Sequence, residues 1–240
     1  MKESQFPSEM LILAGGFGTR LSSVVSNVPK PMAPVGERPF LSYLMDHWIG
    51  QGIRRFRLST GHLAGVIESF FGNYYEGASI VYVHENSPLG TGGALRLALD
   101  AADWSSESVL VANGDTWFPV SLGQLCVDAL SQETPVTLSI KEMERNDRYG
   151  GVSIGNEGKI TSFGATSGGS CLINGGCYLI NAQEVHRELS GMPARFSFEG
   201  DFLPSYAARG FVGSSIQNQP FLDIGIPDDY RRAASFLMNA

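Results

Sequence analysis

Four strand-like segments that alternate with helical patterns constrain the fold of the first half of this chain. These segments occupy residues 9–14, 53–59, 80–84 and 109–112. Helical patterns begin at Pro39, near residue 63 and after residue 93, and the first of them has an apolar stripe formed by Leu41, Leu44, Met45 and Trp48. Repeated strand–helix units form right-handed crossovers and parallel strands. We therefore expect a Rossmann-like α/β fold, whose central sheet is covered by helices on both faces.

The second half of the chain has a different pattern. Strand-like segments at 135–140, 151–154, 159–163, 171–180 and 211–217 are separated in part by glycine-rich turns at 156–158 and 167–169. Such turns favour hairpins, so we expect the sheet to become mixed there. Helices are predicted near 182–190, at 200–208 and at the C-terminus. With 240 residues and 43% hydrophobic content, the chain predicts one domain, with halves at about 9–120 and 121–240.

Composition argues against several classes of protein. The formal net charge of −7 disfavours a nucleic-acid or anionic-membrane partner. No apolar run approaches the about 20 residues that span a bilayer, and the N-terminus lacks a signal-peptide pattern, so a cytoplasmic location is expected. Three cysteines and four scattered histidines match no zinc spacing, so we expect neither a transition-metal site nor a Cys or His nucleophile.

A glycine-rich loop follows the first predicted strand. Gly15, Gly16 and Gly18 allow backbone N–H groups to approach a ligand closely, and Arg20 and Lys30 follow them. Converging N–H groups and two cations form a cradle for several phosphates. A tight connection without a ligand is the other interpretation of this loop by itself.

Two better-known glycine motifs do not fit this loop. The dinucleotide fingerprint requires a third glycine where this chain has Leu21. In a Walker A motif the lysine follows the last glycine directly, whereas Gly18 is followed by Thr19 and Lys30 is a whole loop away. An NAD-dependent oxidoreductase is therefore disfavoured.

Two further loops, 85–93 and 113–117, follow predicted strands in the same way as 15–20. In parallel sheets, ligands bind beyond the carboxyl ends of the strands. Asp115 and Asp223 each end an apolar run, and carboxylates are ligands that Mg²⁺ prefers. The pattern favours a nucleotide with Mg²⁺ over the turn and capping roles common for a lone aspartate.

Four ordered motifs carry a resemblance to a known family. The segments 15–21 with 29–31, 89–93, 113–116 and 223–227 resemble the signature of the sugar-1-phosphate nucleotidylyltransferases, which implies the nucleotide-diphospho-sugar transferase fold. Within that family, the segments 29–32, 113–118 and 223–227 most resemble those of D-glycero-α-D-manno-heptose 1-phosphate guanylyltransferases. Mannose-1-phosphate guanylyltransferases and glucose-1-phosphate thymidylyl- or uridylyltransferases share the skeleton and stay open as alternatives.

The resemblance implies a reaction. A sugar 1-phosphate attacks the α-phosphorus of a nucleoside triphosphate, expected to be GTP, and pyrophosphate leaves. Arg20 would hold the β- and γ-phosphates, Lys30 would neutralise the α-phosphate and the sugar phosphate, and Asp115 and Asp223 would hold Mg²⁺. The product would serve nucleotide-sugar biosynthesis for cell-surface polysaccharide.

The resemblance also implies binding residues. Those for the nucleotide are Leu13, Ala14, Gly15, Gly16, Gly18, Thr19, Glu85, Leu89, Gly90 and Thr91. Those for the sugar are Tyr149, Gly150, Asn174, Gly175 and Glu199, although the glycines also suit crowded strands and Glu199 suits the first turn of a helix.

One departure from the family concerns the cation for the sugar phosphate. Many relatives carry a Glu-Lys pair before the strand that contains Asn174 and Gly175, and the lysine of that pair binds the sugar phosphate. Residues 160–166, which occupy this segment here, contain no such pair. Either Lys30 and the metal suffice, or another cation enters from elsewhere.

A non-catalytic nucleotide-binding regulatory module is the alternative from a different class. Such a module would be expected to lose Arg20, Lys30 or one of the two aspartates, and this chain keeps all four. A homo-oligomer remains compatible with the sequence.

Overall fold

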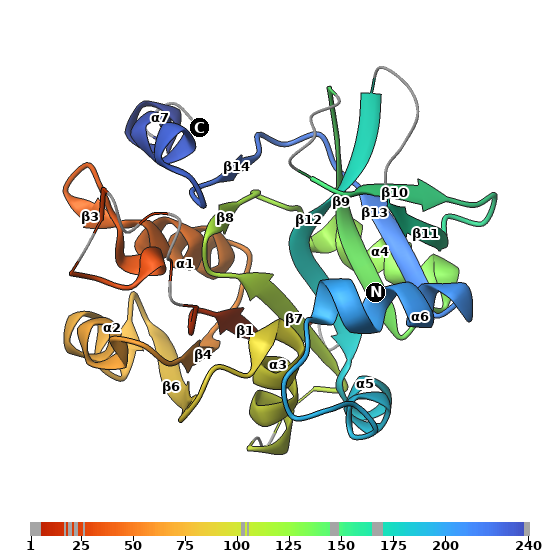
Figure 1. The fold of residues 1–240 in the computed structure, drawn as a ribbon, viewed down its shortest axis with the longest axis horizontal. Helices are drawn as coiled ribbons and strands as arrows, with labels where there is room; N and C mark the ends of the chain where they lie inside the picture. Colours follow the sequence, from red (N-terminus) through yellow and green to blue (C-terminus); the bar gives the residue numbers. More distant parts are fainter. Residues whose placement is uncertain are drawn as a thin grey trace.

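The fold is built on one large mixed sheet, seen in a computed structural model that describes residues 6–16, 18, 21, 24–25, 27–101, 104, 106–144, 149–164 and 170–237 (Figure 1). In this part of the chain the sheet has ten strands, in the order β11-β10-β12-β7-β1-β4-β6-β5, with β9 beside β12 and β13 beside β9. Their bounds are β1 Glu9–Leu13, β4 Arg55–Thr60, β5 Tyr74–Tyr75, β6 Ala78–His84, β7 Ser108–Asn113, β9 Val136–Glu144, β10 Gly151–Ile154, β11 Ile160–Gly164, β12 Ser170–Asn181 and β13 Val212–Ile216.

The four strands predicted in the first half form the parallel centre of this sheet. β1 pairs in parallel with both β4 and β7, and β4 pairs in parallel with β6. The connecting helices are α1 (Phe40–Gly50), α2 (Ala64–Phe71) and α3 (Gly90–Asp100). Pro39 precedes α1, where its fixed φ suits a helix start. The parallel α/β arrangement expected for residues 9–112 is confirmed.

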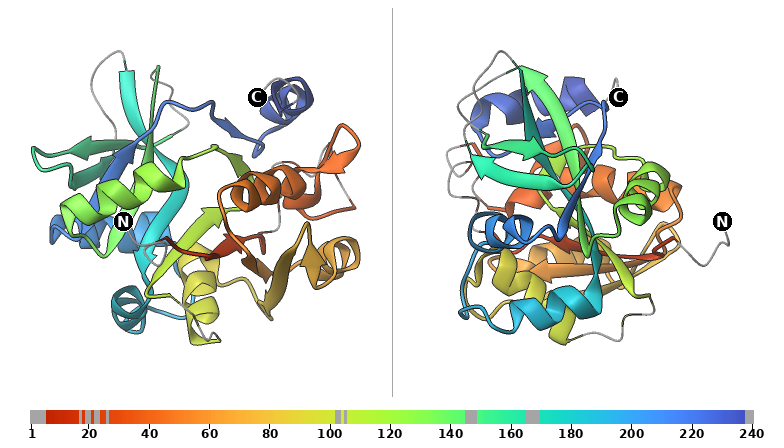
Figure 2. Two further views of the ribbon diagram at one scale, coloured as in Figure 1. Left: turned by 180° about the vertical axis from the view of Figure 1, so that it is seen from behind. Right: turned by 90° about the vertical axis from the view of Figure 1, so that its right-hand side faces the viewer.

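Helices cover both faces of the sheet because successive strand residues point to opposite sides. Met10 and Ile12 of β1 pack into a core with α1, α2, α4 (Leu122–Gln132) and α7 (Pro227–Leu237). Leu11, between them, packs into a second core with α3, α5 (Ala182–Leu189) and α6 (Leu203–Ala208). Figure 2 shows α4 and α6 on opposite sides of the strands between them.

The mixed character expected for the second half is also confirmed. β12 runs antiparallel to both β7 and β9. β10 and β11 form a hairpin, and β13 returns parallel to β9. Because β12 pairs with β7, the two halves of the chain share one sheet. The glycine turn expected at 167–169 lies outside the described residues.

Two elements differ from the sequence prediction. Helix α4 was not predicted, and Ser121 caps it by accepting a hydrogen bond from the backbone N–H of Gln124 at 3.3 Å. The helix expected at 200–208 begins earlier, with a π-helical turn, η3 (Phe198–Phe202), that leads into α6. None of the described helices is long and apolar enough to cross a lipid bilayer.

Candidate active site

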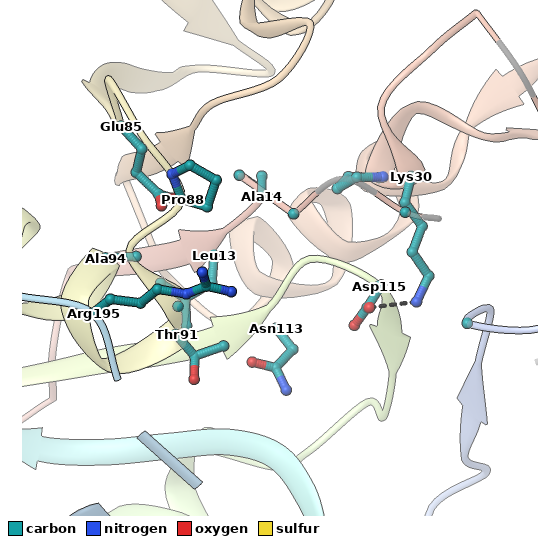
Figure 3. Close-up of a pocket in the computed structure, with 16 residues that line it drawn as sticks. Leu13, Ala14, Lys30, Glu85, Pro88, Thr91, Ala94, Asn113, Asp115 and Arg195 are labelled. Atoms are coloured by element: carbon teal, nitrogen blue, oxygen red, sulfur yellow. Dashed lines mark hydrogen bonds and ion pairs between the residues drawn. The ribbon is translucent and has the colours of Figure 1, made fainter. Parts of the chain in front are cut away.

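The carboxyl ends of β1, β6 and β7 open into one cavity of about 360 Å³ (Figure 3). The cavity therefore lies at the edge of the sheet where parallel strands usually bind ligands. Ten of the residues predicted for the site line it: Leu13, Ala14, Gly15, Gly16, Gly18, Lys30, Glu85, Gly90, Thr91 and Asp115. Thr19 and Arg20 lie outside the described residues.

A buried lysine between two aspartates forms the charged end of this cavity. Lys30 Nζ lies 2.5 Å from Asp115 Oδ2 and 3.6 Å from Asp223 Oδ1, and the Lys30 side chain is only 9% exposed. Lys30 begins the short helix η2 (Lys30–Met32), whereas the two aspartates follow β7 and end β14 (Leu222–Asp223). The three charges compensate one another, which lowers the cost of removing them from water.

The two aspartates are held in place by short local hydrogen bonds. The backbone N–H of Gly225 donates to Asp223 Oδ1 at 2.6 Å, and Thr116 Oγ1 donates to Asp115 Oδ1 at 3.2 Å. β14 also pairs with β8 (Thr116–Trp117), so that Asp223 lies opposite Thr116. This pairing brings an aspartate from near the C-terminus to the end of β7.

The carboxylate oxygens around Lys30 are suitable ligands for a Mg²⁺ ion. Both aspartate carboxylates converge on one cationic position, and they are hard oxygen ligands. Mg²⁺ in proteins is commonly held by one or two carboxylates, with phosphates and water completing its shell. Asp115 and Asp223 are therefore suited to hold it.

The glycine loop leaves no room beside Glu85. A Cβ on Gly15 would overlap the Glu85 carboxylate, whereas a Cβ on Gly16 would meet nothing within 4 Å. Glu85 is fixed on its other sides, because Ser59 Oγ donates to its Oε1 at 3.1 Å and the backbone N–H of Leu89 donates to its Oε2 at 3.3 Å. The bare backbone of Gly15 thus allows an ordered carboxylate at the wall of the cavity.

The first turn of α3 packs against the loop that precedes η3. The Phe196 backbone N–H donates to the Leu89 carbonyl at 3.0 Å, and the Phe196 carbonyl accepts from Gly92 at 3.1 Å. A Cβ on Gly93 would lie 2.8 Å from the Ala194 carbonyl oxygen. Leu89 thus links α3 to this loop through its backbone carbonyl, and it is not among the residues that line the cavity.

A chain of hydrogen bonds runs from Thr91, at the cavity, to Asn174 in β12. Thr91 Oγ1 donates to Glu199 Oε2 at 2.5 Å, the Tyr178 hydroxyl donates to Glu199 Oε1 at 3.1 Å, and Asn174 Nδ2 donates to the Tyr178 oxygen at 3.0 Å. Burial, together with the nearby Glu199 carboxylate, raises the pKa of the Tyr178 hydroxyl well above its ordinary value. Tyr178 therefore remains a proton donor.

None of the five residues predicted for the sugar lines the described cavity. Asn174 and Glu199 belong to the hydrogen-bonded series that begins at Thr91, Tyr149 packs edge-on against Phe221 with ring centroids 5.6 Å apart, and Gly150 is exposed. Gly175 lies where a Cβ would be 2.8 Å from Ser139 Oγ. The register of β12 against β9 shifts between Asn174 and Tyr178, so the Asn-Gly-Gly segment forms a bulge.

Two polar residues that sequence reasoning missed also face the cavity. Asn113 ends β7, and Arg195 comes from the loop before η3 (Figure 3). Asn113 begins the 113–116 motif, and its position at the end of a predicted strand was the available signal. No local pattern marks Arg195, because its approach to the cavity depends on the packing of Phe196 against α3.

Comparisons with known proteins decide the family. A profile of the nucleotidyl transferase family matches residues 9–240. The chain belongs to the nucleotidyl transferase family. This result confirms the resemblance in its motifs, and together with individual relatives it makes the protein a sugar-1-phosphate nucleotidyltransferase.

Individual members of the nucleotidyl transferase family match almost the whole chain. D-glycero-α-D-manno-heptose 1-phosphate guanylyltransferase from Aneurinibacillus thermoaerophilus is 43% identical over 235 residues, with 96% of this chain and 99% of the relative covered. The enzyme of the same name from Campylobacter jejuni is 34% identical over 232 residues, with the same coverage. The crystal structure of HddC from Yersinia pseudotuberculosis has 32% identity and a TM-score of 0.82, covering 95% of this chain and 98% of that one, and it is also known complexed with GMP-PN.

The contact between Gly15 and Glu85 leads to a prediction about stability. Gly15→Ala should lower the melting temperature, because its methyl group displaces a carboxylate held by Ser59 and Leu89. Overpacking of this kind costs about 1–3 kcal/mol. Gly16→Ala is the matched control and should melt like the native protein. Equal melting temperatures for the native protein and both variants would show that the loop accommodates the methyl group of Gly15→Ala without loss of stability.

Proposed function

We propose that this enzyme transfers GMP from GTP to D-glycero-α-D-manno-heptose 1-phosphate, releasing pyrophosphate. The observation that carries the proposal is the Lys30–Asp115–Asp223 cluster at the end of a glycine-lined cavity. The nucleotide is supported by the complex of HddC with GMP-PN, and the sugar by the names of two relatives at 43% and 34% identity.

The proposed chemistry is a single in-line displacement. An oxygen of the sugar phosphate forms a bond to the α-phosphorus, and the bond from that phosphorus to the β-bridging oxygen breaks. Pyrophosphate leaves with the electron pair. Because the attacking oxygen is already anionic, no general base is needed, and the protein contributes positioning and charge.

Lys30 and the two aspartates have complementary roles in this proposal. The Lys30 ammonium neutralises charge on the α-phosphate as the oxygen attacks. Asp115 and Asp223 would hold Mg²⁺, which supplies neutralisation of the phosphate oxygens when bound. Arg20, proposed for the β- and γ-phosphates, keeps that role as an expectation from its motif.

Arg195 is our candidate for the cation that the missing Glu-Lys pair leaves open. Its side chain reaches into the cavity from the opposite wall to Lys30 (Figure 3), and it makes no hydrogen bond or ion pair with any described residue. A planar guanidinium with free N–H groups suits two phosphate oxygens. We propose that it binds the sugar phosphate.

Guanine recognition is proposed for the wall formed by Gly15, Gly16 and Glu85. Guanine presents an acceptor at O6 and donors at N1 and N2, so its site needs an N–H group and an acceptor. The loop backbone offers N–H groups, and the fixed Glu85 carboxylate offers acceptors. A wrong base that leaves one of these groups unpaired costs about 1–3 kcal/mol.

A substrate grid tests the proposed pair. We expect kcat/KM for pyrophosphate release to be highest for GTP with the heptose 1-phosphate, among GTP, ATP, UTP, CTP and dTTP against heptose, mannose and glucose 1-phosphates. Other bases should be about 10- to 100-fold poorer. A maximum at mannose 1-phosphate, or at dTTP or UTP with glucose 1-phosphate, would replace the substrates but keep the transfer reaction. No release with any pair would refute catalysis by this chain.

Neutralising either aspartate should impair turnover. Asp115→Asn and Asp223→Asn each remove one charge that faces Lys30, and kcat should fall by about 10²-fold or more, as for other lost electrostatic stabilisers. The measurement is steady-state pyrophosphate release across a Mg²⁺ titration. Asp228→Asn, on the exposed side of α7, is the control and should stay native-like. Near-native turnover of either site variant at saturating Mg²⁺ would remove that aspartate from the proposed metal site.

Replacing Arg195 should affect the sugar phosphate selectively. Arg195→Gln should raise KM for the sugar 1-phosphate by about tenfold or more, because it removes a charged donor to phosphate, and KM for GTP should change less. Arg231→Gln, which breaks only an exposed ion pair with Asp228, is the matched control. A larger effect on GTP than on the sugar phosphate would assign Arg195 to the nucleotide instead.

A further inference from the structure

Asn113 occupies a central position in the cavity that none of the proposed roles explains. It is the last residue of β7, directly opposite Leu13 of β1 in the parallel register. Its half-buried side chain lines the cavity between Thr91 and Asp115 (Figure 3). It therefore lies between the first turn of α3 and the charged cluster around Lys30.

The side chain of Asn113 has an unsatisfied acceptor. Its Oδ1 atom is buried and makes no hydrogen bond within the described protein. Buried polar atoms in folded proteins almost always have a partner, so an exception requires an explanation, for example a functional role at a site. Asn113 Oδ1 thus lacks a donor in the ligand-free protein.

The backbone around Asn113 holds this amide in place. Gly114 donates its N–H to the Leu13 carbonyl at 2.9 Å, and a Cβ on Gly114 would lie 2.8 Å from that oxygen. On the other side, a Cβ on Gly176 would lie 3.0 Å from Asn113 Nδ2, and Gly176 has a φ of +73°. The amide packs closely on the β12 bulge, so it is restrained from turning away to find water.

We propose that Asn113 Oδ1 accepts a hydrogen bond from a hydroxyl group on a saccharide ring of the substrates. The inference rests on the proposed function, which places phosphates at Lys30 and Asp115. Ionised phosphates have no proton to donate, whereas the ring bonded next to a phosphate carries hydroxyl groups. An acceptor two residues from Asp115 is therefore positioned for such a ring. Asn113 becomes a specificity-determining residue for the transfer reaction.

Two rings offer the same hydroxyl chemistry, the ribose of the nucleotide and the pyranose of the sugar phosphate. One set of assays pairs the intact sugar phosphate with GTP, 2′-deoxy-GTP or 3′-deoxy-GTP. The other pairs GTP with the intact sugar phosphate or with its 2-deoxy, 3-deoxy or 4-deoxy form. Each set is run with the native enzyme, with Asn113→Leu, which has similar size and no acceptor, and with Asn113→Asp, which keeps an acceptor oxygen.

The ratio of kcat/KM between the intact and the deoxy substrate is the quantity to compare. For one of the five deoxy compounds, we expect kcat/KM of the native enzyme to fall by about 10- to 100-fold, as for a buried group left unpaired. With the intact substrate, kcat/KM of Asn113→Leu should be lower than that of the native enzyme by a similar factor. Its ratio of kcat/KM between the intact and the deoxy substrate should be near one. Asn113→Asp should keep the native ratio even if repulsion of phosphate lowers its absolute rate. The ring whose deoxy form shows this coupling is the ring that Asn113 contacts.

Other results would overturn the inference. If Asn113→Leu retains the native ratio for all five deoxy compounds, Asn113 accepts a hydrogen bond from no ring hydroxyl. Asn113→Ala provides a second test of the lost acceptor if the leucine variant does not fold, and Asn156→Leu, in the turn after β10, is a matched control expected to retain native ratios. Native activity on the intact pair tests the proposed function separately, because it does not depend on these ratios.

Discussion

The ammonium group of Lys30, held between Asp115 and Asp223, is the interaction on which the site depends. It joins three segments that are far apart in the sequence: the helix after the glycine loop, the end of β7, and β14 near the C-terminus. Removing the Lys30 charge would leave two partly buried carboxylates side by side without compensation, which is strongly destabilising. Gly225 is required beside it, because a Cβ there would lie 2.9 Å from Lys30 Nζ. The fold and the proposed phosphate site are thus stabilised by the same contacts.

The rest of the cavity extends this cluster into a binding surface. The parallel strands bring the loops after β1, β6 and β7 to one edge, and the packing of Phe196 against α3 adds Arg195 from the second half of the chain. The chain of hydrogen bonds from Thr91 through Glu199 and Tyr178 connects the cavity to the bulge of β12. Cations lie at both ends of the cavity, and a fixed carboxylate and an unsatisfied amide lie between them. We interpret this pattern as suited to a ligand with phosphates, a base and hydroxylated rings.

Much of this arrangement could be predicted from sequence because it depends on local periodicity and on motifs at strand ends. The parallel strands, the glycine loop and the positions of Lys30 and Asp115 are of this kind. Helix α4 was missed because it exposes Val127 and Leu130 while Gln132 bonds to the β13 backbone, which blurs the amphipathic pattern. The role of Arg195 and the unsatisfied oxygen of Asn113 depend on contacts between distant segments, which no local pattern encodes. None of the sugar residues predicted from the family resemblance belongs to the described wall of the cavity.

The central claim is that positioned charges alone carry out the transfer, without a covalent enzyme intermediate. The stereochemistry at the α-phosphorus tests it most directly. The enzyme is given GTPαS of one configuration at that phosphorus, together with the sugar 1-phosphate, and the configuration of the thio-substituted nucleotide sugar is determined by phosphorus NMR. A single in-line displacement predicts inversion. Retention would require two successive displacements through an enzyme-bound nucleotide, and it would contradict the account.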